Sequence, residues 1–231
     1  MIPTVDLPQS AAAASRSLAV FDIDGTLYSA NTLRDCLERF HADRSTPWRL
    51  FFRAARSVPG NMFWAAIARV VRQDLFRRMA FLSLRGVDER SLDDACRAYV
   101  YDVLPDRRCD AAMELLRTCR ARGYQVRLVS GSMAPVVRHI GRINDVGEWL
   151  AAEPVVKEGR YTGAIAHDVQ GRKLAAVEQA WPSFDELIVV TDNKNDLPLV
   201  KRADRAWVVT KTRNVDWWRG QKLAHVSLIE I

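Results

Sequence analysis

The stretch that decides the fold is Leu18-Ala19-Val20-Phe21-Asp22-Ile23-Asp24-Gly25-Thr26-Leu27, near the beginning of the chain. It opens with a short apolar run containing Val and Phe, which is typical of a buried strand. Two carboxylates separated by one residue end the run, and glycine follows. Because side chains alternate between the faces of a strand, Asp22 and Asp24 share one side while Ile23 points into the core. The stretch therefore predicts a strand with paired acids at its carboxyl end.

Paired acids at a strand end favour a bound cation. Burying two like charges together costs free energy unless a cation neutralises them or one carboxyl stays protonated. Mg²⁺ prefers oxygen ligands and usually keeps waters and a substrate phosphate in its remaining positions. The alternative is a loop with two solvated aspartates, and the short D-x-D pattern does not choose between the two interpretations.

Length, charge and cysteine content narrow the class of protein. The 231 residues suit one domain, or one domain with an insert. The net charge of +6 favours anionic partners, and both a phosphorylated metabolite and a nucleic acid fit it. Four cysteines without a C-x-x-C pair indicate reduced thiols in a cytoplasmic protein. Met1 to Ser17 has no basic segment and no long apolar run, so we expect a loosely ordered tail and no membrane span.

A long helical region follows the first strand. Its periodicity and breakers predict helices at about 32–42, 46–56, 61–82 and 91–103, with Thr32 as the first cap. This is too much helix for a simple crossover between strands. We therefore expect a helical domain at residues 30–104, inserted into a core domain made of residues 1–29 and 105–231. Most of its arginines and aromatics are expected on a solvated face or in its own core, with a few closing over a ligand.

The rest of the chain alternates between helix and strand. The expected elements are a helix at 110–122, a strand at 124–129, a helix at 133–142, a strand, turn and returning strand at 153–165, a helix at 174–180 and strands at 186–191 and 206–209. Small hydroxyl residues and glycine, Ser130-Gly131-Ser132, follow the strand at 124–129. A second acidic run, Asp192 to Asp196, follows the strand at 186–191. Because ligands of parallel sheets sit at the carboxyl ends of the strands, these tips are expected to converge.

Four short motifs in this order resemble those of the haloacid dehalogenase-like superfamily. They are Asp22-Ile23-Asp24-Gly25-Thr26, then Ser130, then Lys173 at a helix start, then Asp192 with Asp196. Each motif alone is weak, but together they span the chain from Leu18 to Val209. The resemblance implies an α/β fold, with a Rossmann-like parallel sheet core and an inserted helical cap. The insert after the first motif, and Gly-Arg-Tyr-Thr-Gly before the lysine, further resemble the phosphoserine-phosphatase-like branch, subfamily IB.

The resemblance also implies a mechanism. Asp22 would be the nucleophile that forms an aspartyl-phosphate, and Asp24 the general acid and base. Ser130, the Gly131 amide and Lys173 would hold the phosphoryl oxygens. Mg²⁺ would be bound by Asp22, the backbone carbonyl of Asp24 and Asp192, with Asp196 in support.

Three positions depart from the family pattern. Phosphoserine phosphatases typically carry glutamate nine residues after the nucleophile to hold the substrate's amino group, and this chain has Asn31 there. They commonly have serine where this chain has Gly25. Thr191 stands where the family often has glycine, which leaves the acids of the fourth motif in place. We therefore expect a Mg²⁺-dependent phosphomonoester hydrolase acting on a small phosphorylated metabolite other than phosphoserine.

Two other functions remain open at this point. A phosphotransferase or mutase would use the same covalent aspartate and pass the phosphoryl group to an alcohol. A non-catalytic module binding anions or nucleic acid would also suit the basic balance, but the chain has no RNP-like, zinc-finger or helix-turn-helix pattern, and its arginines alternate with acids. We therefore expect no nucleic-acid partner. Dehalogenase chemistry is disfavoured because Asp24 is retained, and the sequence leaves the oligomeric state open.

Overall fold

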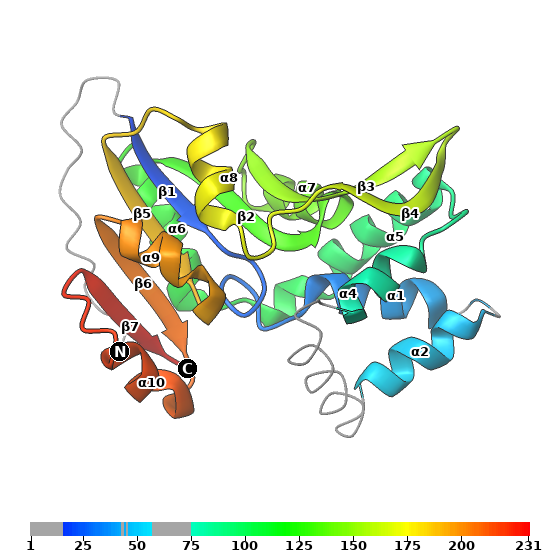
Figure 1. Ribbon diagram of the computed structural model, residues 1–231, viewed down its shortest axis with the longest axis horizontal. Coiled ribbons are helices and arrows are strands. Elements are labelled where there is room, and N and C mark those ends of the chain that lie inside the picture. Colours follow the sequence, from blue (N-terminus) through cyan, green and yellow to red (C-terminus); the bar gives the residue numbers. More distant parts are fainter. Residues whose placement is uncertain (1–15, 43, 45, 57–74) are drawn as a thin grey trace.

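The computed structural model describes residues 16–42, 44, 46–56 and 75–231 (Figure 1). The elements in chain order are β1 (Ser17–Phe21), α1 (Thr32–Ala42), α2 (Pro47–Arg56), α4 (Leu75–Leu82), α5 (Glu89–Asp102), η1 (Leu104–Arg107), α6 (Asp110–Ala121), β2 (Gln125–Met133), α7 (Ala134–Ile143), β3 (Trp149–Lys157), β4 (Arg160–His167), α8 (Lys173–Ala180), β5 (Glu186–Thr191), η2 (Lys194–Asp196), α9 (Leu197–Arg202), β6 (Arg205–Thr210), α10 (Thr212–Arg219) and β7 (Val226–Glu230).

One seven-stranded sheet organises these elements, in the order β4-β3-β2-β1-β5-β6-β7. The sheet is parallel except for β4, which runs antiparallel to β3. The central strand β1 pairs with β2 on one side and with β5 on the other. The chain leaves β1 towards β2 and later returns to the opposite side of β1 as β5. The carboxyl end of β1 is therefore the point where the winding of the sheet changes direction, and this is where such folds bind ligands.

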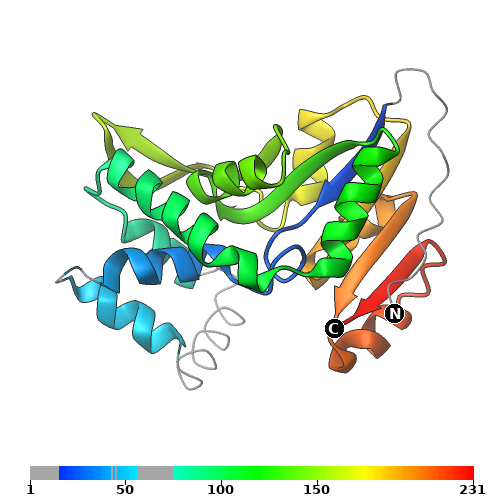
Figure 2. The same cartoon turned by 180° about the vertical axis from the view of Figure 1, so that it is seen from behind.

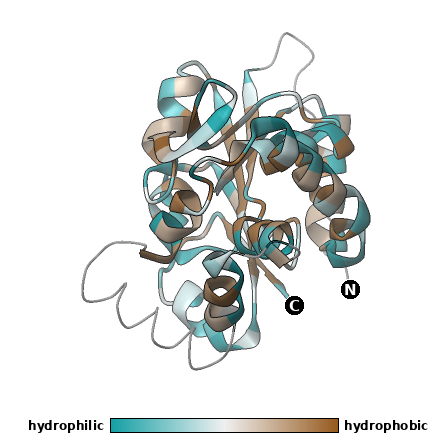
Figure 3. Cartoon of the chain, turned by 90° about the vertical axis from the view of Figure 1, so that its right-hand side faces the viewer, coloured by the Kyte–Doolittle hydropathy of each residue, from teal (hydrophilic) through white to brown (hydrophobic). Residues whose placement is uncertain are grey.

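Both faces of the sheet are covered, as alternation along β1 requires. Ala19 and Phe21 belong to a core that also contains apolar residues of α6 and α7. Leu18 and Val20 belong to a second core, built with residues of α8, α9 and α10. Figure 2 looks onto the face that α6 and α7 cover, and Figure 3 shows the hydrophobic colouring of the inner strands. The predicted α/β class with a mostly parallel sheet is confirmed.

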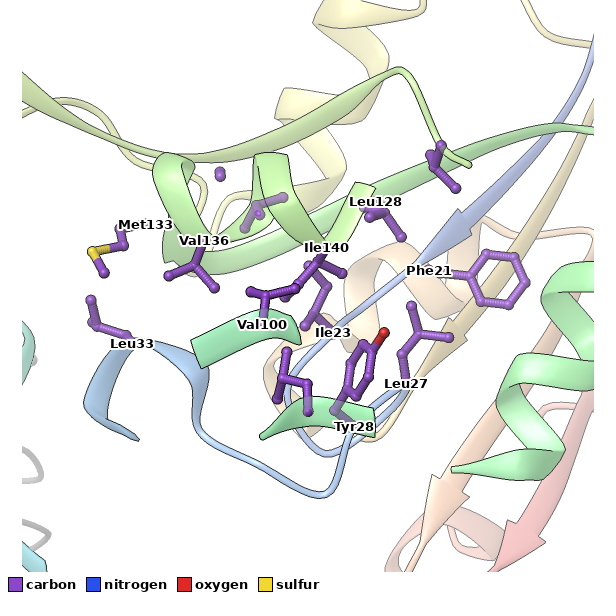
Figure 4. Close-up of a cluster of buried hydrophobic side chains, with 14 of the residues drawn as sticks. Phe21, Ile23, Leu27, Tyr28, Leu33, Val100, Leu128, Met133, Val136 and Ile140 are labelled. Atoms are coloured by element: carbon purple, nitrogen blue, oxygen red, sulfur yellow. The ribbon is translucent and has the colours of Figure 1, made fainter. Parts of the chain in front are cut away.

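Helices α1, α2, α4 and α5 lie together beside the carboxyl edge of the sheet (Figure 1). Their apolar side chains, including Leu33 and Val100, are continuous with the core that holds Phe21 and Ile23 (Figure 4). The turn between β3 and β4 and the start of β4 contact the beginning of α5 and the loop before it. The Glu89 amide donates to the carbonyl of Gly159 at 2.9 Å, and the Gly86 amide donates to that of Tyr161 at 2.8 Å. The boundary between a core domain and an inserted domain stays a prediction.

Several predicted bounds need correction. The strand expected at 124–129 runs on as β2 to Met133, because Ser132 and Met133 are buried and β2 still pairs with β3 at that point. The helix expected from Met133 accordingly begins at Ala134. The helix expected at 91–103 begins earlier, at Glu89, because the Asp88 side chain caps it by accepting from the Ser91 amide. Of the helix expected at 61–82, only Leu75–Leu82 lies within the described residues.

Two further expectations can be compared with the structure. The four cysteines carry free thiols, in line with the prediction of reduced cysteines. The expected N-terminal tail, apart from Arg16 and Ser17, lies outside the described residues. Within the described ranges, no helix combines the length and the apolar character needed to cross a membrane.

Candidate active site

The turn after β1 brings two acids to one pocket. The Asp22 amide still donates to the carbonyl of Val190 on β5, at 2.9 Å, so Asp22 continues the sheet by one residue. Gly25 then turns the chain with a φ of 76°, a left-handed conformation that glycine adopts without a steric penalty. Ile23 is fully buried, while Asp22 and Asp24 both line the pocket. The predicted alternation of side chains at this strand end is therefore present.

Asp22 is buried, and two donors hold one of its carboxylate oxygens. Lys173 Nζ lies 2.9 Å from its Oδ1, the Ile23 amide donates to the same oxygen at 2.8 Å, and the Thr191 hydroxyl lies 3.5 Å from Oδ2. Burial raises the pKa of Asp22, and the charge of Asp196 adds to this, while Lys173 opposes it. The ion pair fixes one carboxylate oxygen of Asp22.

Lys173 begins α8 and is itself almost fully buried. Its ammonium group contacts Asp22 and also Asp196 Oδ2, at 2.8 Å. Burial alone would lower the pKa of Lys173, but the two carboxylates outweigh it and raise the pKa above its ordinary value. The lysine therefore stays charged at neutral pH. Asp196 also accepts from the Thr191 hydroxyl at 2.7 Å, so its role in this arrangement is to hold the lysine.

Asp24 and Asp192 have weaker partners. The amide of Thr32, at the start of α1, donates to Asp24 Oδ1 at 2.9 Å, and the Thr26 hydroxyl donates to Asp192 Oδ1 at 3.2 Å. Burial raises the pKa of Asp24 to about 7. Burial and the charge of Asp22 raise the pKa of Asp192 to about 7 as well. The carboxylate of Asp192 lies so close to Gly25 that a Cβ there would meet its Oδ2 at 2.2 Å.

Ser130 and Gly131 form another wall of the pocket, at the end of β2. Ser130 is fully buried, and its Oγ accepts from the Ser132 amide at 3.1 Å. The Ser132 hydroxyl lies 2.7 Å from the Thr32 hydroxyl, which links β2 to the start of α1. A Cβ at Gly131 would meet the side-chain oxygen of Gln170 at 2.1 Å, so the position is closely packed.

These groups share a pocket of about 160 Å³. The predicted residues that line it are Asp22, Asp24, Ser130, Gly131 and Lys173, and they are joined by Asn31, Leu33, Phe76, Arg77, Gln170 and Asn193. Asp192 lies on the neighbouring side, in a second pocket that also contacts Gly25 and Asn31. Asp196 sits behind Lys173 and lines neither.

The carboxylates are suited to a hard divalent cation. Within the described ranges, no three side chains of His, Cys, Asp or Glu form a metal-binding group. The expected set differs from such a group, because it uses the carboxylates of Asp22 and Asp192 with the backbone carbonyl of Asp24. Burial raises the pKa of Asp192 and the charge of Asp22 raises it further, so the two carboxylates repel each other. An oxygen-rich set under such repulsion fits Mg²⁺.

Sequence reasoning missed several groups that hold the site. Thr191 donates to Asp196 and lies 3.5 Å from Asp22 Oδ2. Thr32 contacts both Asp24 and Ser132, although it was expected only as a helix cap. Asn31 is the residue whose side chain caps α1, because its Oδ1 accepts from the Arg34 amide at 3.0 Å. The position of each threonine next to a motif was a signal that could have been used, but the hydrogen-bond partners of Thr32 are distant in sequence.

Comparison with known proteins agrees with this geometry. The family model described as haloacid dehalogenase-like hydrolase matches residues 19–201. A curated relative from Mycobacterium tuberculosis H37Rv, named a probable phosphatase, is 24% identical over 215 residues, which cover 90% of this chain and 74% of the relative.

Solved structures show the same fold. A protein from Bordetella pertussis Tohama I, described as being of unknown function, has a TM-score of 0.75 at 21% identity, over 93% of this chain and 98% of that one. A phosphoserine phosphatase carrying a phospho-aspartyl intermediate analogue has a TM-score of 0.53 at 19% identity, over 84% of this chain and 87% of that one. The predicted family and the prediction of a phosphatase-like enzyme are confirmed: the chain belongs to the haloacid dehalogenase-like hydrolases.

Proposed function

We propose that the protein is a Mg²⁺-dependent phosphomonoester hydrolase that acts through an aspartyl-phosphate on Asp22. The observation that carries this proposal is the pairing of a buried Asp22 with Lys173, at the point where β1 and β5 end side by side. One oxygen of Asp22 is held by Lys173 and by the Ile23 amide, which leaves the other oriented for attack. In the proposed first step, an oxygen of Asp22 bonds to phosphorus while the bond from phosphorus to the ester oxygen breaks.

Asp24 is the general acid and base of this proposal. Its raised pKa of about 7 lets the carboxyl carry a proton near neutral pH and donate it to the departing alkoxide. The resulting carboxylate then accepts a proton from the water that attacks the aspartyl-phosphate. The Thr32 amide holds Asp24 Oδ1, so the second oxygen is the one that exchanges the proton.

Lys173, the Ser130 hydroxyl and the Gly131 amide hold the phosphoryl oxygens in this proposal. Because the Ser130 Oγ accepts from the Ser132 amide, its own hydrogen is free to be donated. Asp22, Asp192 and the backbone carbonyl of Asp24 would hold Mg²⁺, and Asp196 supports the set through Lys173. When bound, the ion offsets the repulsion between the anionic nucleophile and the anionic phosphate.

The substrate of this proposal is a small phosphorylated metabolite other than phosphoserine. Asn31 lines the pocket where a phosphoserine phosphatase typically has glutamate, and a neutral amide cannot form an ion pair with a substrate ammonium group. We further propose that residues 30–104 act as a lid over a core of residues 1–29 and 105–231, since Leu33, Phe76 and Arg77 of the helical region line the pocket. A cytoplasmic location, and the expectation of no nucleic-acid partner, belong to the same proposal.

Hydrolysis of p-nitrophenyl phosphate with Mg²⁺, and its loss with EDTA, tests the function. Asp22→Asn is expected to lower kcat by about 10⁴-fold or more, as removal of a nucleophile does in other covalent enzymes. Asp185→Asn, at a carboxylate paired on the surface with Arg16, is the matched control. Full activity in Asp22→Asn protein would overturn the covalent mechanism. Product analysis with a competing alcohol separates hydrolysis from phosphoryl transfer, and nucleic-acid binding that weakens steeply with salt would favour the binding module.

A further inference from the structure

Arg77 of α4 reaches out of the helical region and contacts two segments of the sheet domain. It is 6% exposed, which is unusual for an arginine. Its guanidinium forms a two-point ion pair with Asp168, with Nε 3.1 Å from Oδ2 and Nη2 2.8 Å from Oδ1. Its Nη1 donates to the backbone carbonyl of Gly131, and its Cζ lies 5.1 Å from the centre of the Phe81 ring. Burying a charge in this way is favourable only with such partners.

The contact with Gly131 bears on the phosphate-binding side of the pocket. In a planar trans peptide the C=O and the following N–H point in opposite directions. The carbonyl of Gly131 points to Arg77, so the N–H of the same peptide, which belongs to Ser132, points away from it and donates to Ser130 Oγ. Arg77 therefore fixes the peptide that orients the Ser130 hydroxyl.

The contact with Asp168 bears on the segment that leads to Lys173. Asp168 Oδ1 also accepts from the Gln170 amide at 2.9 Å. The Gln170 side chain in turn lies against Gly131, where a Cβ would meet its oxygen at 2.1 Å. One guanidinium thus joins the end of β2 to the turn before α8, and both segments carry groups that the proposed function assigns to phosphate binding.

We infer that Arg77 is a positioning residue, which makes the phosphate-binding arrangement of Ser130, Gly131 and Lys173 depend on the docking of α4. This inference rests on the proposed function. Arg77 lines the pocket, but its Nε, Nη1 and Nη2 are directed to Asp168 and to Gly131, so the role assigned to it is exerted through these protein contacts. The helical region would in this way assemble the site as well as cover it.

Three variants test the inference. Arg77→Lys keeps the charge but loses the planar fork, Asp168→Asn removes the ion pair from the other side, and the double variant tests their coupling. Arg78→Lys is the matched control, because Arg78 is the exposed neighbour on the same helix. The readouts are kcat and KM for p-nitrophenyl phosphate, and the affinity of the Mg²⁺-loaded protein for inorganic phosphate by calorimetry.

Both single variants are expected to lower kcat by about ten- to a hundredfold and to weaken phosphate binding by about tenfold, with the double variant no worse than the poorer single one. Arg78→Lys is expected to match the wild type. Hydrogen exchange of the peptide containing Ser132 should speed up in Arg77→Lys protein. Hydrogen exchange can be measured in a protein that has lost its activity. If Arg77→Lys fails to fold, the same measurement is made on the Asp168→Asn variant.

Two results would overturn the inference. Arg77→Lys protein that behaves like Arg78→Lys in every readout would remove the positioning role. Additive losses in the double variant, with phosphate affinity unchanged by Asp168→Asn, would mean that Arg77 contacts the substrate directly. If the wild type itself neither binds phosphate nor hydrolyses the ester, the proposed function fails, which is a distinct outcome.

Discussion

The four acids of the candidate site fall into two pairs, here called halves, that are compensated differently. Asp22 and Asp196 share Lys173, so each of these carboxylates lies within 3 Å of an ammonium group. Asp24 and Asp192 are contacted by an amide and a hydroxyl, and no lysine or arginine of the described ranges forms an ion pair with either. In the first half, one buried ammonium group of the fold compensates both carboxylates. In the second half, the charge depends on protons or on a cation, and this is the property that acid–base and metal chemistry require.

Asp24→Asn, in the half without a lysine partner, is expected to have the largest effect, which is a fall in kcat. Because an amide cannot donate a proton to the leaving oxygen, kcat should fall by about 10²–10⁴-fold for an alkyl phosphate. The fall should be much smaller for p-nitrophenyl phosphate, whose leaving group is stable as an anion. Steady-state kinetics on both esters measures the difference. Equal losses on the two esters would contradict the acid role, and phosphate affinity should stay within a fewfold of the wild type.

Lys173→Met breaks the compensated half. It leaves Asp22 and Asp196 buried without their shared cation, so the free energy of unfolding at pH 7 should fall by about 3–5 kcal/mol. The loss should shrink as the pH is lowered, because the two carboxyls can then be protonated. Denaturant unfolding at several pH values measures this. Arg172→Met, at the exposed neighbouring residue, should change stability little, and a loss of stability independent of pH would argue against the ion-pair explanation.

Gly25→Ala disturbs the uncompensated half through Asp192. The left-handed backbone at Gly25 and the contact with Asp192 should together cost about 1–3 kcal/mol of stability. Displacement of the carboxylate should weaken Mg²⁺ binding by about tenfold. Gly123→Ala is the matched control, because Gly123 has a φ of 84° with nothing near its Cβ position. Mg²⁺ titration of both variants separates the backbone effect from the contact, and equal affinities would exclude a role of Asp192 as ligand.

The smallest expected effect is a pH dependence of Mg²⁺ stabilisation. The pKa values of Asp24 and Asp192 are raised to about 7 in the folded protein from an ordinary 3.8. Between these values the folded state binds more protons than the unfolded state, so stability without metal should fall as the pH rises from about 4 to about 7. Mg²⁺ replaces these protons. The rise in Tm on adding Mg²⁺ should therefore be larger at pH 8 than at pH 5, and a rise independent of pH would contradict the argument.

The main elements of the sheet and site were predictable because their signals are local. Apolar, β-branched runs stop at Asp22, Ser130 and Asp192, at or near the ends of β1, β2 and β5, and parallel strands bring these positions to one edge. The edge strand β7 was missed, because Val226–Glu230 is short, buries only Ile229 and carries little periodicity. The extra length of β2 was missed because serine and glycine usually indicate a turn.

The supporting contacts were not predictable from one sequence. Thr32 meets Ser132 across 100 residues, and Arg77 meets Asp168 across 91, so nothing in the neighbourhood of either residue reveals its partner. Composition suggested that most arginines of the helical region are solvated, and Arg78 is exposed in this way while Arg77 is buried. The difference between these neighbours arises from their directions on α4, which tertiary packing decides.

The position of β1 has a consequence for durability. This strand has hydrogen-bonded neighbours on both sides and apolar layers above and below, so its amides should be among the last to exchange with solvent in the whole molecule. The reactive carboxylate at its tip is thus anchored to the part of the chain that fluctuates least. On heating or in mild denaturant, the helices near the pocket entrance should unfold first. Activity should therefore be lost well before β1, which carries Asp22, unfolds.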